Sequence, residues 1–344
     1  MPRSGTPVNR KTKGSSKVSA PKAPWIDLHF HGAYGVDLMG AEPSAVQAMA
    51  RRLRRAGVAA FCPTTLTAPH PELCQAIVKL GAFTCEQRQA VARGLRRDES
   101  LSLGLHLEGP FLSPKACGAH PPGALQPFSF KTLEEFWRLS SETLRILTIA
   151  PELLEARDLK RLGAWAKERK VTLSAGHSRA TTKQAHAAFE AGFRGVTHAW
   201  NAMAFSHREP GILGASLAYP NVYWELISDQ VHVAPETVQL SVRARGPEQV
   251  CLVSDCTPAG GTRAGVYSFG PIAVHRKEGA SRIATGEHAG ALAGGGDVLP
   301  TMIQNLIKRL PELAQFTRAF RQSPARALGL SAFERRELKL RLQR

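Results

Sequence analysis

The stretch Leu103-Gly104-Leu105-His106-Leu107-Glu108-Gly109-Pro110-Phe111 is an apolar run that ends on one carboxylate and is broken at once by glycine and proline. This pattern predicts a buried strand that opens onto a loop at Glu108. In an α/β barrel, metal ligands and acid/base residues lie at this end of a strand. Taken alone, Glu108 could equally be a residue that caps the next turn, so the other strand ends decide between the two interpretations.

Seven further apolar runs have a similar character, and longer amphipathic segments separate them. The expected strands are 25–31, 58–66, 101–108, 144–151, 171–177, 195–201, 223–229 and 249–255. The expected helices include 44–56, 71–93, 152–169 and 181–191. A regular alternation of strand and helix favours right-handed βαβ units around one parallel sheet. Eight strands are the number that a closed barrel needs, so the predicted fold class is α/β, a (β/α)8 TIM barrel.

Side chains that can bind a metal gather at the carboxyl ends of these expected strands. The set comprises His29, His31, Glu108, His177, His198 and Asp255. His29 and His31 are two positions apart on one strand and therefore point to the same side. Each residue alone has a plain structural explanation, but burying all six together without a cation would carry a large desolvation cost. The sequence therefore predicts a site for one or two divalent ions, with Zn, Fe, Mn and Co all compatible.

This set of ligands also suggests a class of reaction. A bound divalent metal lowers the pKa of water from about 15.7 toward roughly 7. A neighbouring carboxylate such as Asp255 can take a proton from that water and pass it to a leaving nitrogen. Hydrolysis of an amide-like bond is the reaction that we expect.

Several blocks along the chain occur in an order and spacing typical of a known family. They are Ile26-Asp27-Leu28-His29-Phe30-His31-Gly32, Pro63-Thr64-Thr65-Leu66, His106-Leu107-Glu108-Gly109-Pro110-Phe111, Gly118-Ala119-His120, Ala150-Pro151-Glu152, Gly176-His177-Ser178, Thr197-His198-Ala199-Trp200-Asn201-Ala202-Met203, His207-Arg208-Glu209-Pro210-Gly211, Asp229-Gln230-Val231-His232-Val233, Ser254-Asp255, Leu292-Ala293-Gly294 and Ser323-Pro324-Ala325-Arg326-Ala327-Leu328-Gly329. Over about residues 25–330 the chain resembles the N-acetylglucosamine-6-phosphate deacetylases of the amidohydrolase superfamily.

The resemblance implies a role for each matching residue. Glu108, His177 and His198 would hold the principal metal, and His29 with His31 would complete a second position. Asp255 would be the catalytic acid/base, and His120 would contact the sugar or polarise the acetamide carbonyl. The implied substrate pocket contains Ala119, Asn201, Ala202, Leu292 and Ala293.

The resemblance also implies a partner and a substrate. Arg208 and His232 match positions that grip the 6-phosphate, and in the family they come from the neighbouring subunit of a dimer. A guanidinium can bind two phosphate oxygens at once, which suits this role. We therefore expect a homodimer that acts on N-acetyl-D-glucosamine 6-phosphate. The same chemistry on another N-acetyl amino sugar, phosphorylated or derived from cell walls, remains the alternative.

The ends of the chain depart from the family pattern. Family members carry a small β-sandwich built from segments before and after the barrel, and we expect it to be absent or vestigial here. Residues 1–24 contain six Lys/Arg and no acidic residue, which predicts a disordered basic tail. Residues 331–344 are expected to form a charged C-terminal tail. The turn-rich segment 258–290 and the glycine-rich segment 286–296 are expected to form loops or a hairpin over the barrel mouth.

Composition limits the remaining possibilities. The 344 residues are 43% apolar without a run of eighteen apolar residues, which predicts a large core and no membrane span. Six cysteines without a CxxC pair or a secretory signal suit reduced thiols in a cytoplasmic protein. The net charge of +17 is spread over the chain and no nucleic-acid motif accompanies it, so we expect no nucleic-acid binding. A catalytically idle barrel that binds nucleic acid or an acidic partner through its basic surface is the remaining alternative, and it predicts missing metal ligands.

Overall fold

A barrel of parallel strands forms the centre of the computed structural model, which describes residues 24–286 and 288–342. Its strands, in the order in which they pair, are β1 (Trp25–Phe30), β4 (Val58–Thr65), β6 (Leu105–Glu108), β7 (Leu144–Ile149), β8 (Thr172–Ala175), β9 (Gly195–Val196), β10 (Tyr223–Ile227) and β11 (Val250–Val253). A short strand, β5 (Leu101–Ser102), pairs with β4. Each of the eight expected strands is present, and the predicted TIM barrel is confirmed.

The barrel is closed by contacts between its first and last strands. Phe30 and Cys256 form a parallel bridge, and the Asp255 N–H donates to the His29 carbonyl at 3.0 Å. The buried Asp27 carboxylate accepts bonds from the Ser254 N–H at 3.1 Å and from its hydroxyl at 2.5 Å. These contacts hold the end of β1 against the residues that follow β11.

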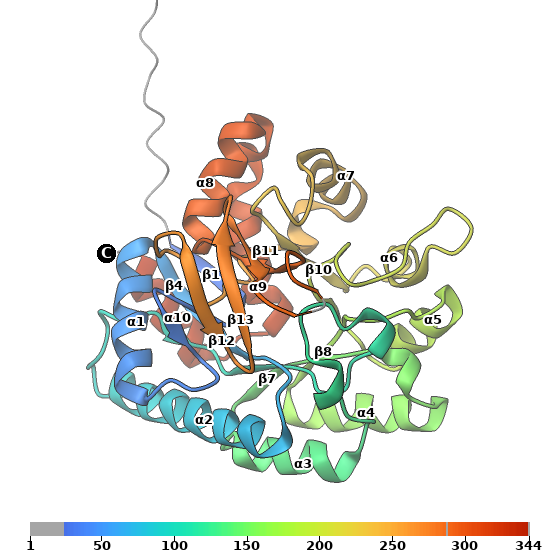
Figure 1. Ribbon diagram of the computed structural model, residues 1–344, viewed down its shortest axis with the longest axis horizontal. Helices are drawn as coiled ribbons and strands as arrows, with labels where there is room; N and C mark the ends of the chain where they lie inside the picture. The colour runs from blue at the N-terminus through green and yellow to red at the C-terminus, as the bar shows by residue number, and fades with distance from the viewer. Residues whose placement is uncertain (1–23, 287, 343–344) are drawn as a thin grey trace, which may run out of the picture.

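Helices surround the barrel, as Figure 1 shows. They are α1 (Pro43–Ala56), α2 (His70–Ala92), α3 (Phe130–Leu139), α4 (Ala156–Arg169), α5 (Thr182–Glu190), α6 (Gly211–Ser216), α7 (Pro235–Arg245), α8 (Leu299–Arg309), α9 (Thr317–Leu328) and α10 (Ala332–Leu342), with short 3-10 turns at Pro114–Ala116, Pro122–Ala124, Pro151–Leu153, Pro247–Gln249 and Pro311–Phe316. The start of α5 illustrates how sequence sets these bounds. Thr181 caps it and Gln184 completes a capping box, which satisfies two backbone donors that the first turn leaves unpaired.

The segment after β11 forms a small antiparallel sheet beside the barrel mouth. Its strands are β12 (Gly265–Phe269), β13 (Ile272–Lys277), β14 (Ala280–Ile283) and β15 (Leu292–Gly295). Gly295 bridges to Cys256, and its N–H donates to the Asp255 carbonyl at 2.8 Å. The expected loops or hairpin are therefore a four-stranded sheet fixed directly to the end of β11. A further short pair, β2 (Gly32–Ala33) and β3 (Val36–Asp37), follows β1.

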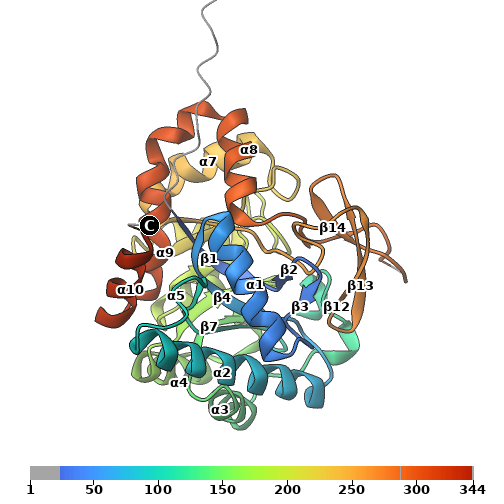
Figure 2. The same cartoon turned by 90° about the vertical axis from the view of Figure 1, so that its left-hand side faces the viewer.

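The last helix covers the opposite end of the barrel. Figure 2 shows α10 on one side of the molecule and the β12–β14 sheet on the other. Leu338 is buried among the starts of β1 and β4, and Glu337 is fully buried. The segment 331–344, expected as a charged tail, thus forms a packed helix over Ala332–Leu342.

The basic segment 1–24, predicted to be a disordered tail, lies outside the described residues except for Pro24. In 24–286 and 288–342, none of the helices has the length and apolar character that crossing a membrane requires. All six cysteines are free thiols.

Candidate active site

Two of the expected ligands, His177 and His198, converge on one oxygen of Glu108 at the end of β6. The Oε1 atom lies 3.2 Å from His177 Nε2 and 3.0 Å from His198 Nε2. The two ring nitrogens are 2.9 Å apart. All three side chains are buried, so this cluster lies on the floor of the barrel mouth.

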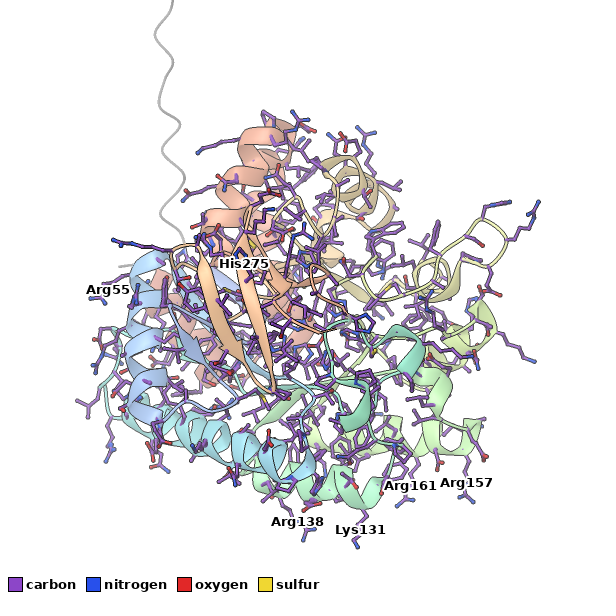
Figure 3. The ribbon with its side chains drawn as sticks, in the orientation of Figure 1. Arg55, Lys131, Arg138, Arg157, Arg161 and His275 are labelled. Carbon is purple, nitrogen blue, oxygen red and sulfur yellow. The ribbon has the colours of Figure 1, made fainter. Side chains whose placement is uncertain are left out.

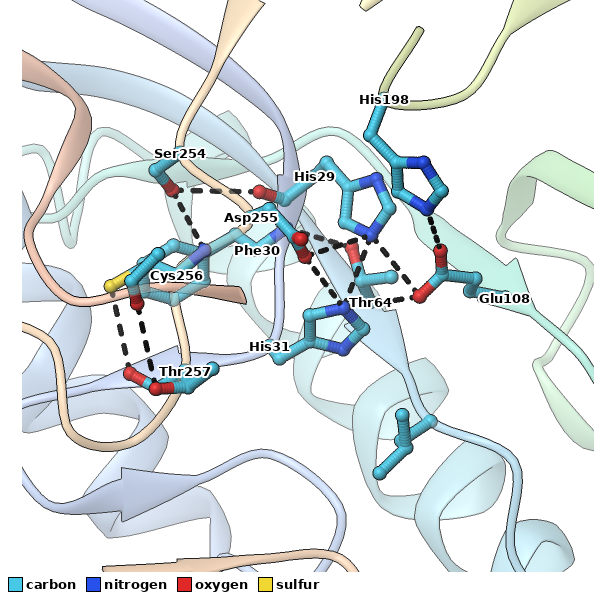
Figure 4. Close-up of polar contacts among 12 residues, drawn as sticks. His29, Phe30, His31, Thr64, Glu108, His198, Ser254, Asp255, Cys256 and Thr257 are labelled. Atoms are coloured by element: carbon cyan, nitrogen blue, oxygen red, sulfur yellow. Dashed lines mark hydrogen bonds and ion pairs between the residues drawn. The ribbon is translucent and has the colours of Figure 1, made fainter. Parts of the chain in front are cut away.

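The other oxygen of Glu108 faces a second cluster, shown in Figure 4. Oε2 lies 3.2 Å from both His29 Nε2 and His31 Nε2, and these nitrogens are 3.1 Å apart. Asp255 Oδ1 closes the group at 3.3 Å from His29 and 3.2 Å from His31. One carboxylate therefore joins two sets of ligands, and the six residues predicted at the strand ends do meet.

The ring orientations leave lone pairs directed into both clusters. His177 Nδ1 lies 2.8 Å from the Ala116 carbonyl oxygen, and His29 Nδ1 lies 3.1 Å from Glu225 Oε2. Because each partner only accepts, the proton of a neutral ring sits on Nδ1 and Nε2 stays unprotonated. Unprotonated nitrogens facing one another at about 3 Å repel unless a cation lies among them. The side chains thus fit divalent cations. Two nitrogens bound to one tetrahedral zinc by bonds of about 2.0–2.1 Å would lie roughly 3.3 Å apart, close to the separations in both clusters.

The backbone is strained where three of these residues leave their strands. His177, His198 and Asp255 have φ of 47°, 31° and 48°, in the left-handed region that non-glycine residues rarely adopt. Such conformations cost roughly 1–3 kcal/mol each and concentrate at functional sites. The strain turns each side chain away from the barrel wall and toward the shared centre.

The charges of the cluster reinforce one another. Burial alone would raise the pKa of Asp255, but the adjacent His29 and the hydrogen-bonded His31 lower it to about 2. Burial likewise opposes ionisation of Glu108, yet His29 and the hydrogen bond from the His120 Nε2–H hold its pKa well below the usual range. Both carboxylates are therefore negatively charged at neutral pH, as metal ligands and proton acceptors must be.

His120 points toward the same centre from the loop after β6. Its Nε2 lies 3.4 Å from Glu108 Oε2. On the other side of the ring, the Thr67 N–H donates to Nδ1 at 3.2 Å, so the proton of the neutral ring sits on Nε2. Burial, followed by the neighbouring His177, lowers the pKa of His120 to about 4. The ring is therefore neutral at pH 7 and presents an N–H to the pocket.

A pocket of about 550 Å³ opens above these residues. All but one of the residues predicted to contact substrate line it, namely Ala119, His120, Asn201, Ala202, His232, Leu292 and Ala293. Arg208 does not line the pocket of this chain and is exposed on the loop before α6.

Several site residues escaped the sequence analysis. Lys115, Arg179 and His288 line the pocket and add to His232 as basic groups. The Arg179 Nε–H donates to the Lys115 carbonyl at 3.1 Å, which draws the two segments together at the rim. Glu225 is fully buried beneath His29. It could have been found from the sequence, because it is the one carboxylate in the otherwise apolar strand β10.

This chain is similar to known proteins in both sequence and structure. No family model matches the chain. The N-acetylglucosamine-6-phosphate deacetylase of Bacillus subtilis (strain 168) is 33% identical over 268 residues, 78% of this chain and 65% of that protein. The N-acetylgalactosamine-6-phosphate deacetylase of Escherichia coli O157:H7 is 35% identical over 268 residues, 78% of this chain and 68% of that protein. The chain thus spans about two thirds of the length of these relatives.

Solved structures extend the similarity beyond the barrel core. A mutant N-acetyl-D-glucosamine-6-phosphate deacetylase from Mycobacterium smegmatis, in complex with N-acetyl-D-glucosamine-6-phosphate, matches with a TM-score of 0.76 and 30% identity. That match covers 93% of this chain and 82% of the other. The N-acetylglucosamine-6-phosphate deacetylase from Thermotoga maritima matches with a TM-score of 0.73 and 30% identity, covering 92% of this chain and 78% of that one.

Proposed function

Because this chain belongs to the N-acetylglucosamine-6-phosphate deacetylase family of the amidohydrolase superfamily, we propose that it hydrolyses N-acetyl-D-glucosamine 6-phosphate to D-glucosamine 6-phosphate and acetate. The observation that carries the proposal is the pair of ligand clusters joined by Glu108 at the floor of the pocket. An idle barrel would have lost some of these ligands, and here all six are present and face one another.

The fold family implies a divalent cation, and we assign its ligands from the two clusters. Glu108, His177 and His198 would hold the principal ion, and His29 and His31 would hold a second. Such an ion supplies Lewis acidity, which polarises an acetamide carbonyl and makes a water molecule acidic. The buried Glu225 carboxylate orients His29 for this role, as outer-shell acceptors do for metal-binding imidazoles.

Asp255 is the residue that we assign to proton transfer. Both Asp255 and Glu108 line the pocket, but the Asp255 side chain is 13% exposed and that of Glu108 is 2% exposed, so Asp255 is the more accessible carboxylate. As an ionised group it takes a proton from the attacking water, and it then gives that proton to the nitrogen of the departing amino sugar. His120 presents its Nε2–H to the acetamide oxygen and stabilises the charge that develops there.

The walls of the pocket are suited to a phosphorylated sugar. Asn201, Ala202 and His232 line one side, and Leu292 and Ala293 line the side formed by β15. Lys115 and Arg179 at the rim add positive charge for a phosphate. Arg208, exposed outside this pocket, would complete the phosphate site of the other subunit in a homodimer.

The test is acetate release by metal-stripped protein reloaded in turn with Zn, Fe, Mn and Co. The substrates are N-acetylglucosamine 6-phosphate and N-acetylglucosamine. We expect metal-dependent release from the phosphorylated sugar, with little from the free sugar. The absence of release with every metal, from protein shown by circular dichroism to be folded, would overturn the proposal.

A second substrate belongs in the same assay. The E. coli relative is named an N-acetylgalactosamine-6-phosphate deacetylase and is 35% identical to this chain. The two sugar phosphates differ only in the configuration at C4, and the metal and phosphate sites described above do not depend on it. A higher kcat/KM for N-acetylgalactosamine 6-phosphate would support the same deacetylation reaction but would assign that sugar phosphate as the substrate.

A further inference from the structure

A cluster of potential metal ligands lies outside the pocket, where α2 meets α3. His70 is the first residue of α2, and Cys74 lies one turn later on the same face. Glu135 approaches from α3. The Nε2 atom of His70 is 3.4 Å from Cys74 Sγ and 3.4 Å from Glu135 Oε2, and the three ligand atoms all lie within 4.8 Å of one another.

The two distances from His70 Nε2, 3.4 Å each, match the edges of a metal coordination tetrahedron, and the carboxylate and the thiol lie within 4.8 Å of each other. Zinc binds imidazole nitrogen at about 2.0–2.1 Å, thiolate at about 2.3 Å and carboxylate oxygen at about 2.0–2.2 Å. The edges of a tetrahedron with such bonds are roughly 3.3–3.6 Å long. The 3.4 Å between Cys74 and His70 also fits a thiol–imidazole hydrogen bond, but a hydrogen bond from the His70 Nε2–H to Glu135 would be shorter than the 3.4 Å observed.

The surroundings hold the ligands yet leave an approach from solvent. The His70 ring packs on Phe136, whose side chain is buried, with ring centroids 5.6 Å apart. His70 and Glu135 are 39% and 42% exposed, so an ion can enter and a water can fill the fourth position. One thiolate, one imidazole and one carboxylate suit a borderline divalent ion such as zinc.

We propose that His70, Cys74 and Glu135 form a separate zinc site that joins the start of α2 to α3. Three residues before His70, Thr67 contacts His120 through both its N–H and its hydroxyl. An ion at this site therefore fixes the segment that positions His120. The assignment rests on these side chains alone and does not depend on the proposed deacetylase activity.

Cobalt(II) provides the first test, because a thiolate bound to cobalt gives a charge-transfer absorption that oxygen and nitrogen ligands do not give. We expect this absorption when metal-stripped full-length protein is titrated with cobalt, and its loss in Cys74→Ser. Cys85→Ser is the matched control, since Cys85 lies on the same helix, is also partly buried and belongs to none of the ligand clusters in the described residues. Cys117→Ser is the second control because Cys117 lines the pocket.

Equilibrium dialysis against zinc provides the second test. Wild-type protein should bind one more ion per chain than Cys74→Ser. His70→Ala should weaken this extra site by more than the roughly 10- to 100-fold that loss of an outer-shell partner costs. Equal zinc content in wild type and Cys74→Ser, or a cobalt–thiolate absorption that disappears in Cys117→Ser, would overturn the proposal.

Discussion

Asp255 differs from Glu108 in how its oxygens are used. Both oxygens of Glu108 contact imidazoles, whereas Asp255 contacts His29 and His31 through Oδ1 and its side chain is the more exposed of the two. We expect Asp255→Asn to lower kcat by about 100- to 10,000-fold, the range typical of a lost general acid/base. Metal content, measured by mass spectrometry of the dialysed protein, should stay close to that of wild type because the principal ligands remain.

The thermal unfolding midpoint of Asp255→Asn serves as the control for folding. A variant that loses both activity and metal would show that Asp255 acts chiefly as a ligand. A variant that retains activity would remove Asp255 from proton transfer altogether.

Arg179 is the residue at the pocket rim that we expect to assist phosphate binding. Arg179→Ala should raise KM for N-acetylglucosamine 6-phosphate by roughly tenfold, equivalent to the loss of one charge-assisted hydrogen bond of about 1.5 kcal/mol. KM for the unphosphorylated sugar should change little. Arg157→Ala is the matched control, because Arg157 extends into solvent at the edge of the molecule (Figure 3). Equal effects on both sugars would exclude a phosphate contact.

Arg208 tests whether two chains share a site. Arg208→Ala should raise KM for the phosphorylated sugar, and Asp255→Asn should abolish turnover. If Arg208 acts on the neighbouring subunit, a co-expressed mixture of the two variants contains one intact site per mixed dimer. Activity in that mixture at low substrate, above the sum of the separate variants, is the expected result. If a mixture shown to contain mixed dimers recovers no activity, Arg208 does not act in the site of the neighbouring subunit.

Individual residues differ in how far sequence could predict them. His29, His31, Glu108 and Asp255 could be located because strand ends are visible as breaks in apolar runs. Arg179 could not, because an arginine that starts a loop has the same local pattern whether it faces a pocket or solvent. Its position follows from the packing of the 115–119 and 177–179 loops, which no local periodicity encodes.

At the scale of elements, the barrel strands were the easiest feature to predict. Strands buried on both faces are almost continuously apolar, and β1 and β4 are buried along their whole length. β12–β15 were predicted only as loops or a hairpin, because their exposed residues and many glycines weaken the alternation that marks a strand. The helix α10 was missed because, beside Leu338, the residues that its described part buries are the charged Glu334, Glu337 and Arg341.

That helix carries a prediction about stability. Glu337 is fully buried and pairs with the buried Arg341 at 3.2 Å. Glu337→Gln leaves the Arg341 charge without its partner, and we expect a loss of roughly 3 kcal/mol in the free energy of unfolding. Arg336→Ala is the control, since Arg336 is 64% exposed and surface pairs contribute little. Urea denaturation measures both, and an unchanged midpoint for Glu337→Gln would show that solvent reaches this pair.

At the scale of the whole molecule, the basic segment joins the barrel away from the site. Pro24 lies beside α9 and α10, at the end where β1 begins, while the pocket lies where β1 ends. Deleting residues 1–22 should therefore leave kcat/KM within about twofold of wild type. The assay is acetate release at low substrate. A collapse of kcat/KM in folded protein would assign the segment a part in catalysis.

The closure of the barrel has a consequence during synthesis. Asp27 and Ser254 are bonded across 227 positions of sequence, so β1 leaves the ribosome long before its partner exists. Through that interval the apolar side chains of β1 lack their final neighbours, a condition that invites aggregation. The contact between His29 and Asp255 forms only after the two edges meet. A metal held by both residues would therefore distinguish finished molecules from nascent chains whose barrel is still open.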